Sequence, residues 1–249
     1  MGKLDGKVAV ITGGSAGIGL AAAKLFVREG ATVVITGRDQ QALDVAKRGI
    51  GHGVDVVRCD NAQLADIEAL RAYVDAKHGR VDILFANAGG GRPALFEETK
   101  EDDFDFMIGT NFKGAYFTVQ KLLPLMGAGS SVIFTTSTLG TQGRPYVTVY
   151  AAAKAALRSL ARSLSVELSD RSIRVNALAP GYIDTDQARK AGMSEEMIEQ
   201  TKAQVHPQIP MHRSGSADEI ANAALFLACS DSSYVTGIEL SVDGGWAQV

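Results

Sequence analysis

Cysteine is scarce in this sequence: only two occur among 249 residues, far apart and each in an apolar segment. A framework of disulfides is therefore excluded, and we expect Cys59 and Cys229 to be reduced residues of the core. A chain of this length can bury a substantial core without disulfides or a structural metal.

An excess of charge of either sign is also missing. The 25 basic and 28 acidic side chains leave a formal net charge of −3, which gives no sign of a nucleic-acid-binding surface or a polybasic membrane patch. No apolar run approaches the length needed to cross a bilayer, and residues 1–7 lack the hydrophobic region of a signal peptide. The four histidines lack the spacing of metal ligands, so we expect no catalytic metal. These absences point to a cytoplasmic protein without nucleic-acid or membrane partners.

Short runs rich in valine and isoleucine recur between longer amphipathic stretches. Most of these runs are continuously apolar, as in parallel strands covered on both faces. They predict strands over 7–12, 32–36, 54–58, 81–86, 131–136, 173–178 and 238–242. The stretches between them predict helices over 17–29, 40–48, 61–78, 101–126, 150–169 and 216–229. This alternation implies a doubly wound α/β fold, and the lack of a linker or repeat predicts one domain over residues 1–249.

One stretch interrupts the alternation. Residues 181–210 form a long excursion after the sixth strand, with the patterns of one or two short helices. The excursion is either a surface insertion or a lid over the substrate. We favour a lid over residues 186–206, because insertions after strand ends border the ligand crevice in such sheets.

A glycine-rich turn follows the first predicted strand. Residues 12–19 read Thr-Gly-Gly-Ser-Ala-Gly-Ile-Gly and lead into an alanine-rich helix. Glycines at such a junction let backbone N–H groups and the helix N-terminus meet a pyrophosphate. Gly13 would permit the tight turn, Gly17 the close approach of the ligand and Gly19 the packing of helix on strand. The spacing differs from the common G-x-G-x-x-G fingerprint, but its position predicts a nucleotide-binding turn rather than a plain turn.

Four polar residues stand at positions suited to catalysis. Tyr150 and Lys154 are four apart at the start of a predicted helix, so they share one face. Ser137 follows the fifth strand, at the sheet edge where ligands bind. Asn111 falls inside a helical stretch, although asparagine is a mediocre helix former. The alternatives are a packing tyrosine, a surface lysine, a turn serine and a surface asparagine.

Taken together, these motifs resemble those of the short-chain dehydrogenase/reductase family over essentially the whole chain. The matching residues are the turn at 12–19, Asp60, Asn87-Ala88-Gly89, Asn111, Ser137, Tyr150, Lys154, Pro180-Gly181 and Thr185. Over its whole length the sequence is similar to those of bacterial NADP-dependent alcohol dehydrogenases and carbonyl reductases of this family. One departure is Asn61, where the family more often has an apolar residue. The resemblance implies a Rossmann fold: a central, mostly parallel sheet of seven strands with helices on both faces.

The resemblance also implies an oxidoreductase that transfers a hydride between NADP(H) and a ketone, aldehyde or secondary alcohol. Tyr150 would exchange the proton, and Lys154 would lower the pKa of that phenol. Ser137 would hold the substrate oxygen, and Asn111 would position a water in a proton relay. The implied cofactor-binding residues are Gly13, Ser15, Gly17, Ile18, Gly19, Arg38, Asp60, Asn61, Asn87, Ala88, Gly89, Tyr150, Lys154, Pro180, Gly181, Ile183 and Thr185.

The end of the second strand bears on the choice of cofactor. An enzyme selective for NAD usually has a carboxylate just past this strand, on the ribose hydroxyls. Here Gly37 takes the first candidate position, and Arg38 follows with a planar guanidinium suited to phosphate. We therefore expect NADP(H) to be preferred over NAD(H). The alternative is a surface Arg38, with Asp39 on the ribose.

The sequence does not identify the substrate. Residues expected at the pocket mix polar and apolar character and exclude little; they are Gly91, Arg92, Leu139, Gln142, Tyr182 and Met193. A 3-oxoacyl-carrier-protein reductase shares these motifs but would need a basic patch for its acidic carrier. Candidates for that patch are Arg158, Arg162, Arg171 and Arg174. The non-enzymatic alternative is a nucleotide-binding scaffold or sensor, and the presence of Ser137, Tyr150 and Lys154 argues against it.

The helix predicted over 150–169 has a face of small residues. Ala152, Ala156, Ser159 and Ser163 would let another helix approach closely, and the family resemblance adds helix packing across two-fold axes. We therefore expect a homotetramer, the alternative being close packing within one subunit.

Overall fold

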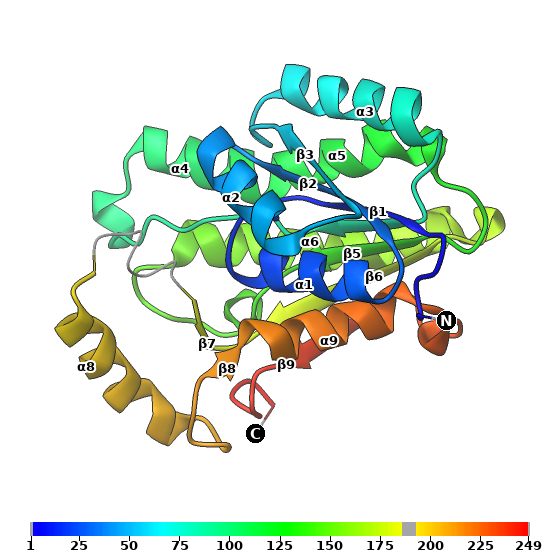
Figure 1. Cartoon of the computed structure of the whole chain (residues 1–249). Coiled ribbons are helices and arrows are strands. Elements are labelled where there is room, and N and C mark those ends of the chain that lie inside the picture. Colours follow the sequence, from blue (N-terminus) through cyan, green and yellow to red (C-terminus); the bar gives the residue numbers. More distant parts are fainter. Residues whose placement is uncertain (1, 186–192, 249) are drawn as a thin grey trace.

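The centre of the fold is a parallel sheet. A computed structural model of the chain describes residues 2–185 and 193–248. Seven strands lie in the order β3-β2-β1-β4-β5-β6-β9, and every neighbouring pair is parallel (Figure 1). Their bounds are β1 (Val8–Ile11), β2 (Thr32–Gly37), β3 (Val54–Arg58), β4 (Ile83–Ala86), β5 (Ser131–Thr135), β6 (Arg174–Pro180) and β9 (Glu239–Val242). The order reverses between β1 and β4, so the loops leaving these two strands border a crevice at the carboxyl edge.

Burial on both faces explains the continuous apolar runs. Every residue of β1, β4 and β5 is buried. Val10 pairs with Val34 on one side and with Leu84 on the other, so the middle of β1 has a strand on each side as well as a helix layer on each face. Branched side chains suit this environment. The predicted seven-stranded sheet is thereby confirmed, with shifts at strand ends such as β6, which runs two residues further than expected.

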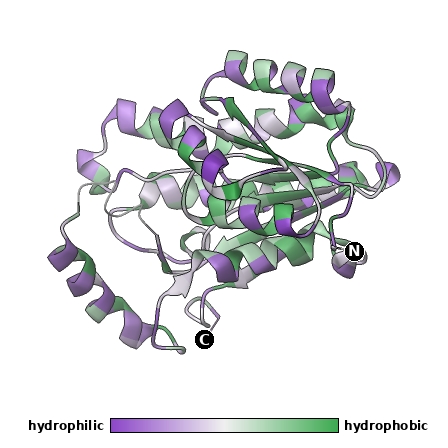
Figure 2. Ribbon diagram, in the orientation of Figure 1, coloured by the Kyte–Doolittle hydropathy of each residue, from purple (hydrophilic) through white to green (hydrophobic). Residues whose placement is uncertain are grey.

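Two layers of helices cover the sheet, α1, α2 and α9 on one face and α3, α5 and α6 on the other (Figure 1). Their bounds are α1 (Gly17–Arg28), α2 (Gln40–Ile50), α3 (Leu64–His78), α5 (Gly114–Leu122), α6 (Thr148–Glu167) and α9 (Ala217–Ala228). Phe26 and Ile220 belong to the core on the first face, and Leu70 and Leu157 to the core on the second. Figure 2 shows this pattern as green strands with purple concentrated on the outer turns of the helices.

The prediction of a single helix over 101–126 is wrong. This stretch consists of α4 (Glu101–Ile108), a π-helical turn (Gly109–Lys113), α5 and a 3-10 turn (Leu123–Leu125). Asn111 lies in the π turn and donates its side-chain amide to the Met107 carbonyl and to the Gly90 carbonyl, both at 2.8 Å. Pro124 lacks the N–H that a continuing α-helix needs. The apolar spacing persists across both breaks, which is why the pattern predicts one helix.

Two helix starts also differ from expectation. The helix predicted from residue 61 begins at Leu64, because Asp60 draws the preceding residues into a turn. Its side-chain Oδ1 accepts from the Ala62 N–H at 3.0 Å, and its carbonyl accepts from the Gln63 N–H at 2.9 Å. Helix α6 begins at Thr148, two residues before Tyr150, so the tyrosine lies within its first turn.

The excursion after β6 forms a small structure of its own. β7 (Ile183–Asp184) pairs in parallel with β8 (Gly215–Ser216), and α8 (Glu195–Val205) lies between them in the chain. α8 stands apart from the central sheet, at the left of Figure 1, and its Lys202 ammonium lies 3.1 Å from the Asp184 carboxylate. The lid predicted over 186–206 stays a prediction, because residues 186–192 lie outside the described residues.

Candidate active site

The glycine-rich turn leaves the N-terminus of α1 open to a ligand. Gly13 and Gly17 have φ values of 66° and 51°, a region that favours glycine. The residue before α1 is Ala16, which offers no side-chain cap, and the first turn of α1 holds no acidic residue. Among the described residues outside its own turn, a Cβ on Gly17 would meet only the Thr185 side chain, 3.6 Å away. Uncapped N–H groups at the start of a helix fit the pyrophosphate of a dinucleotide.

Asn87 joins the ends of three strands. The N–H groups of Asn87 and Ala88 donate to the Thr12 hydroxyl at 3.0 and 2.9 Å, and the Asn87 amide donates to the Thr12 carbonyl at 3.1 Å. The Thr135 hydroxyl donates to Asn87 Oδ1 at 3.2 Å. The ends of β1, β4 and β5 are therefore fixed to one another at the crevice. Sequence reasoning gave no role to Thr12 or Thr135; Thr12 at least opens the glycine turn, whereas nothing in the sequence marks Thr135.

Asn111 holds the loop that follows β4. It is fully buried, and its Oδ1 accepts from the Gly90 N–H at 3.2 Å while its amide donates back to the Gly90 carbonyl. A Cβ on Gly89 would lie 2.6 Å from Asn111 Oδ1 and 3.3 Å from Lys154 Nζ. The structure thus brings Gly89, Asn111 and Lys154 together. Because its side chain is engaged with backbone groups, a role for Asn111 in a proton relay stays a prediction.

Tyr150 and Lys154 share one face of α6, as their spacing predicts. Lys154 is 3% exposed, and its Nζ lies 5.4 Å from the centroid of the Tyr150 ring. The ammonium donates to the Thr135 carbonyl at 2.7 Å. The Ser137 hydroxyl lies near enough to the Tyr150 phenol to lower its pKa, and Ser137 also caps a short 3-10 turn by accepting from the Leu139 N–H at 3.2 Å. A serine, a phenol and an ammonium therefore meet where β5 ends.

Burial, rather than charge, dominates the acid–base behaviour of this pair. Burial lowers the pKa of Lys154 to about 8. The pKa of Tyr150 is raised, because burial outweighs the hydrogen bond with Ser137 that lowers it. This corrects the expectation that Lys154 lowers the pKa of the phenol. The reason is geometric: the ammonium directs a hydrogen to the Thr135 carbonyl and faces the ring of Tyr150.

Arg38 is exposed at the end of β2. Its guanidinium carbon lies 5.6 Å from the centroid of the Phe106 ring, and the Arg92 guanidinium carbon lies 4.0 Å from the same centroid. Arg92 is paired with Asp103 at 2.8 Å, whereas within the described residues Arg38 forms no ion pair. The Asp39 carboxylate caps α2, accepting from two N–H groups at 2.8 and 3.2 Å. Asp39 is therefore engaged in its own helix, which favours Arg38 as the ligand-facing group.

Ser15 lies next to the same strand end. A Cβ on Gly37 would come within 3.2 Å of the Ser15 hydroxyl oxygen, so the glycine turn and the end of β2 are in contact. The side chain of Asn61, by contrast, points into the protein. It is 5% exposed, donates to the Thr118 hydroxyl at 3.4 Å and accepts from the Cys59 thiol at 4.0 Å. Asp60 and Asn61 therefore have structural partners, and their part in an adenine pocket stays a prediction.

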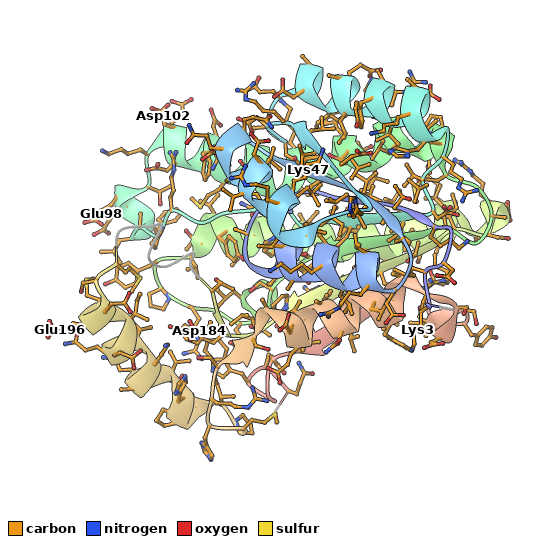
Figure 3. The ribbon with its side chains drawn as sticks, in the orientation of Figure 1. Lys3, Lys47, Glu98, Asp102, Asp184 and Glu196 are labelled. Carbon is orange, nitrogen blue, oxygen red and sulfur yellow. The ribbon has the colours of Figure 1, made fainter. Side chains whose placement is uncertain are left out.

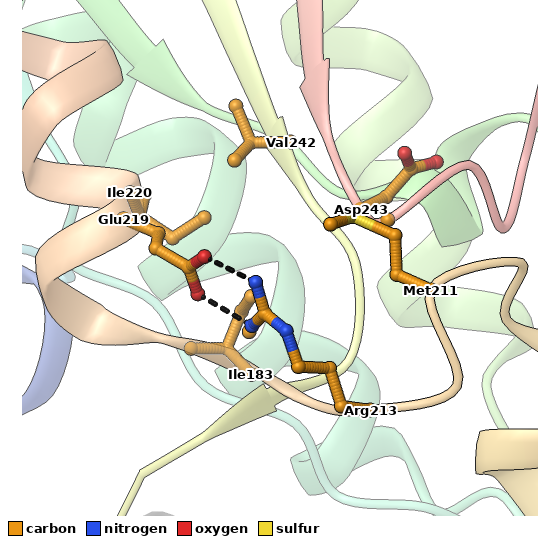
Figure 4. A pocket seen from close by; sticks show the side chains of 9 residues that line it. Ile183, Met211, Arg213, Glu219, Ile220, Val242 and Asp243 are labelled. Atoms are coloured by element: carbon orange, nitrogen blue, oxygen red, sulfur yellow. Dashed lines mark hydrogen bonds and ion pairs between the residues drawn. The ribbon is translucent and has the colours of Figure 1, made fainter.

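The far end of the site is formed by the chain after β6. Pro180 ends that strand, the Gly181 N–H donates to the Val242 carbonyl at 3.1 Å, and Ile183 begins β7. A small cavity of about 90 Å³ lies behind Ile183, beside an ion pair of Arg213 with Glu219 (Figure 4). None of the three reactive side chains lines this cavity, so it is not where the chemistry would occur. Ile18 lies in the first turn of α1.

Within residues 2–185 and 193–248, no group of three or more His, Cys, Asp or Glu side chains could hold a metal ion. No helix in the same residues is long and apolar enough to cross a membrane. Cys59 and Cys229 are both buried and free, as expected.

Comparisons with known proteins agree with this geometry. Residues 13–247 match the family model described as enoyl-(acyl carrier protein) reductase. The chain is 45% identical to the oxidoreductase asL5 of Sarocladium schorii, over 99% of this chain and 98% of that protein. It is 38% identical to the 3-oxoacyl-[acyl-carrier-protein] reductase FabG of Thermotoga maritima, over 98% of each chain. A short-chain type dehydrogenase/reductase from Mycobacterium marinum superposes with a TM-score of 0.90 at 30% identity, covering 99% of this chain and 97% of that chain.

Proposed function

Because the chain belongs to the short-chain dehydrogenase/reductase family, we propose that it is an NADP(H)-dependent alcohol dehydrogenase or ketoreductase. It would transfer a hydride between the nicotinamide and a ketone, an aldehyde or a secondary alcohol. The observation that carries this proposal is the meeting of Ser137, Tyr150 and Lys154 at the carboxyl edge of the sheet. A binding-only scaffold would have no use for that arrangement.

The bound nicotinamide supplies the hydride. Reduction of a carbonyl leaves an alkoxide, which needs a proton and stabilisation of its charge. Tyr150 would donate the proton and Ser137 would hold the substrate oxygen, since the Ser137 hydroxyl lies near enough to the phenol to influence its pKa. The phenol of Tyr150, whose pKa burial raises, carries at neutral pH the proton that reduction of a carbonyl needs. Lys154, fixed by the Thr135 carbonyl, would bind the ribose next to the nicotinamide.

The cofactor would lie along the loops of the crevice. Backbone groups of the glycine turn would bind the pyrophosphate, and the loops after β3 and β4 would border the adenosine. The chain from the end of β6 through β7 would border the nicotinamide. The proposed contact residues are Gly13, Ser15, Gly17, Ile18, Gly19, Arg38, Asp60, Asn61, Asn87, Ala88, Gly89, Tyr150, Lys154, Pro180, Gly181, Ile183 and Thr185.

Preference for NADP(H) follows from the end of β2. Arg38 has no carboxylate partner within the described residues, and Asp39 is engaged as a helix cap. A charge-assisted contact with a 2′-phosphate is worth roughly 1.5–3 kcal/mol, which corresponds to about tenfold to hundredfold in affinity. We therefore expect kcat/KM to be higher with NADPH than with NADH by a factor in that range.

The alternative substrate is a 3-oxoacyl group on a carrier protein. The similarity to FabG favours it. The candidate basic patch gives little support: Arg162 is exposed on α6, but Arg171 and Arg174 lie just after the end of α6 and at the amino end of β6, where both donate to main-chain carbonyls. Arg158 lies 3.6 Å from the Glu239 carboxylate. Acidic side chains on the side of α4 and α8 would repel an acidic carrier; Figure 3 labels Glu98, Asp102 and Glu196 there. We therefore propose a small carbonyl compound, rather than a carrier-bound 3-oxoacyl group, as the substrate.

Assembly and location complete the proposal. We expect one catalytic domain over residues 1–249, since the sheet draws strands from residue 8 to residue 242. A homotetramer is supported by the predicted small-residue face of α6, where Ala152, Ser159 and Ser163 are exposed and Ala156 is half-buried. Val166 extends this exposed face. Buried, free cysteines suit the cytoplasm, where thiols stay reduced.

Steady-state assays with NADPH and NADH against ketones, sugars and 3-oxoacyl thioesters test the function. Arg38→Ala should remove most of the NADPH preference, and Gly37→Asp should move it toward NADH, because an added carboxylate repels a 2′-phosphate. Arg48→Ala, on the exposed surface of α2, is the matched control and should leave the preference for NADPH over NADH unchanged. Equal kcat/KM with both cofactors in the unmodified enzyme would contradict the assignment of Arg38, and no turnover of any carbonyl compound would contradict the function.

A further inference from the structure

The loop that joins Ser137 to Tyr150 is held in an unfavourable conformation. Tyr146 has a φ of 68°, a left-handed backbone that residues with a side chain rarely adopt. Its carbonyl accepts from the Ala94 N–H at 3.0 Å, and its ring is half exposed. Such strain persists only where the surroundings enforce it. The hydrogen bond from Ala94 is one contact from outside the loop that holds this conformation.

The C-terminal turn, residues 243–248, is the second structure in contact with this loop. The Gln142 side-chain amide donates to the Trp246 carbonyl at 3.0 Å, and the Arg144 guanidinium carbon lies 5.2 Å from the centroid of the Trp246 ring. Gln142 Oε1 and Trp246 Nε1 are buried and have no hydrogen-bond partner within the described residues. Burying a polar group without a partner is unfavourable, so stability alone does not account for this contact.

The C-terminal turn is itself firmly anchored. The Asp243 carboxylate accepts from the Gly245 and Ala247 N–H groups, both at 2.9 Å. The Met211 N–H donates to the Gly244 carbonyl at 3.2 Å, which ties the turn to the end of the excursion that contains α8. Because β9 leads directly into it, the turn is built on the central sheet. It is therefore a rigid support against which the loop can be held.

We propose that the C-terminal turn positions the catalytic loop, with Gln142, Arg144 and Trp246 as the positioning residues that keep Ser137 against Tyr150. The inference rests on the proposed function, because that function requires Ser137 and Tyr150 to lie together at the active site. None of the three positioning residues needs to touch the substrate. Their effect would reach the reaction through the conformation of residues 138–149.

The protein contains a single tryptophan, so its fluorescence reports on Trp246 alone. Gln142→Met keeps the length of the side chain but removes the donor, and Arg144→Met removes the guanidinium. We expect the emission of Trp246 to move to longer wavelength in both variants and its quenching by acrylamide to increase. Arg144→Lys keeps a cation over the ring and should restore the wild-type signal. Gln120→Met, at an exposed glutamine of α5, is the control and should leave the emission unchanged.

Kinetics separate positioning from a merely structural contact. With NADPH and ethyl 3-oxobutanoate, Gln142→Met should lower kcat by about tenfold, because small displacements of reacting groups have large effects on rate. The dissociation constant for NADPH should stay unchanged. In the oxidation of ethyl 3-hydroxybutanoate with NADP⁺, the pH of half-maximal rate should move upward, since a displaced Ser137 no longer lowers the pKa of Tyr150.

Two results would overturn the inference. One is an unchanged kcat and pH profile in variants whose Trp246 emission has moved, which would show that the contact breaks without consequence. The other is unchanged emission in Gln142→Met.

If the unmodified enzyme reduces no carbonyl compound, the proposed function fails, and hydrogen exchange then decides the inference separately. Residues 138–149 must exchange faster in Gln142→Met than in the wild type, and equal rates would refute positioning.

Discussion

Burial of Lys154 should make the stability of this protein depend on pH in a way that one substitution removes. The pKa of Lys154 falls from the usual 10.5 to about 8 in the folded protein, because burial disfavours the charged form. At 1.36 kcal/mol per pH unit, keeping Lys154 protonated in the folded protein lowers the free energy of unfolding by about 3 kcal/mol. The hydrogen bond to the Thr135 carbonyl offsets part of this, but that bond forms in either charge state.

The sign follows from which state binds more protons. Below pH 8 the lysine is protonated in both the folded and the unfolded protein, so the full penalty applies. As the pH rises toward 10.5, the folded protein releases the proton first, the unfolded protein binds more protons, and the free energy of unfolding increases. Between pH 7 and pH 9.5 this contribution amounts to about 2 kcal/mol in favour of the folded protein.

Urea unfolding of the wild type and Lys154→Met measures this contribution. Both proteins should be studied at one concentration, because association of subunits also stabilises the folded state. The difference in unfolding free energy, wild type minus variant, should rise by about 2 kcal/mol from pH 7 to pH 9.5. Lys47→Met, at an exposed lysine of α2 labelled in Figure 3, should give a difference that is flat with pH. A flat difference for Lys154→Met as well would refute the reasoning.

Three further outcomes are expected. Tyr150→Phe should lower turnover by at least ~10²-fold, as expected for lost acid–base catalysis, while the NADPH dissociation constant stays near its wild-type value; near-normal turnover would exclude the tyrosine as the proton donor. Gly19→Ala would place a Cβ 2.2 Å from the Gly13 carbonyl oxygen, so NADPH should bind at least ~10-fold more weakly, whereas Gly49→Ala, with no atom within 4 Å, should bind it normally. Light scattering at micromolar concentration should give the mass of a tetramer, reduced by Val166→Glu on the exposed face of α6; a monomer mass in the wild type would end the tetramer proposal.

The sequence predicts the sheet well because its strands are buried on both sides. β1 and β4 are four-residue apolar runs whose length and branched side chains leave little room for another structure. It also predicts that Tyr150 and Lys154 meet, since a spacing of four places them on one face of any helix. These are local properties, readable from the order of residues alone.

What the sequence does not predict depends on distant partners. The π turn at Asn111 exists because its side chain reaches Met107 and Gly90, and only the folded chain brings Gly90 there. The pKa of Tyr150 is raised, whereas the sequence predicts a lowered pKa. The shift depends on burial and on where the ammonium of Lys154 points. The Thr135 carbonyl that holds this ammonium is a main-chain atom, which no sequence motif distinguishes.

The two cations of the proposed site lie in opposite environments, and this decides what each can do. Lys154 is 3% exposed and held by a main-chain oxygen, so its charge acts in a low dielectric on groups a few ångströms away. Arg38 is exposed and rests on the ring of Phe106, so water and salt screen its interaction with a phosphate. Screening limits an exposed cation to the modest energies that discriminate between two cofactors. Burial lowers the pKa of Lys154 to about 8, so the charge of this cation changes with pH in the range where the proposed proton transfer would be assayed. For this reason we expect Arg38→Ala to act on cofactor preference, and changes around Lys154 to act on turnover and its pH profile.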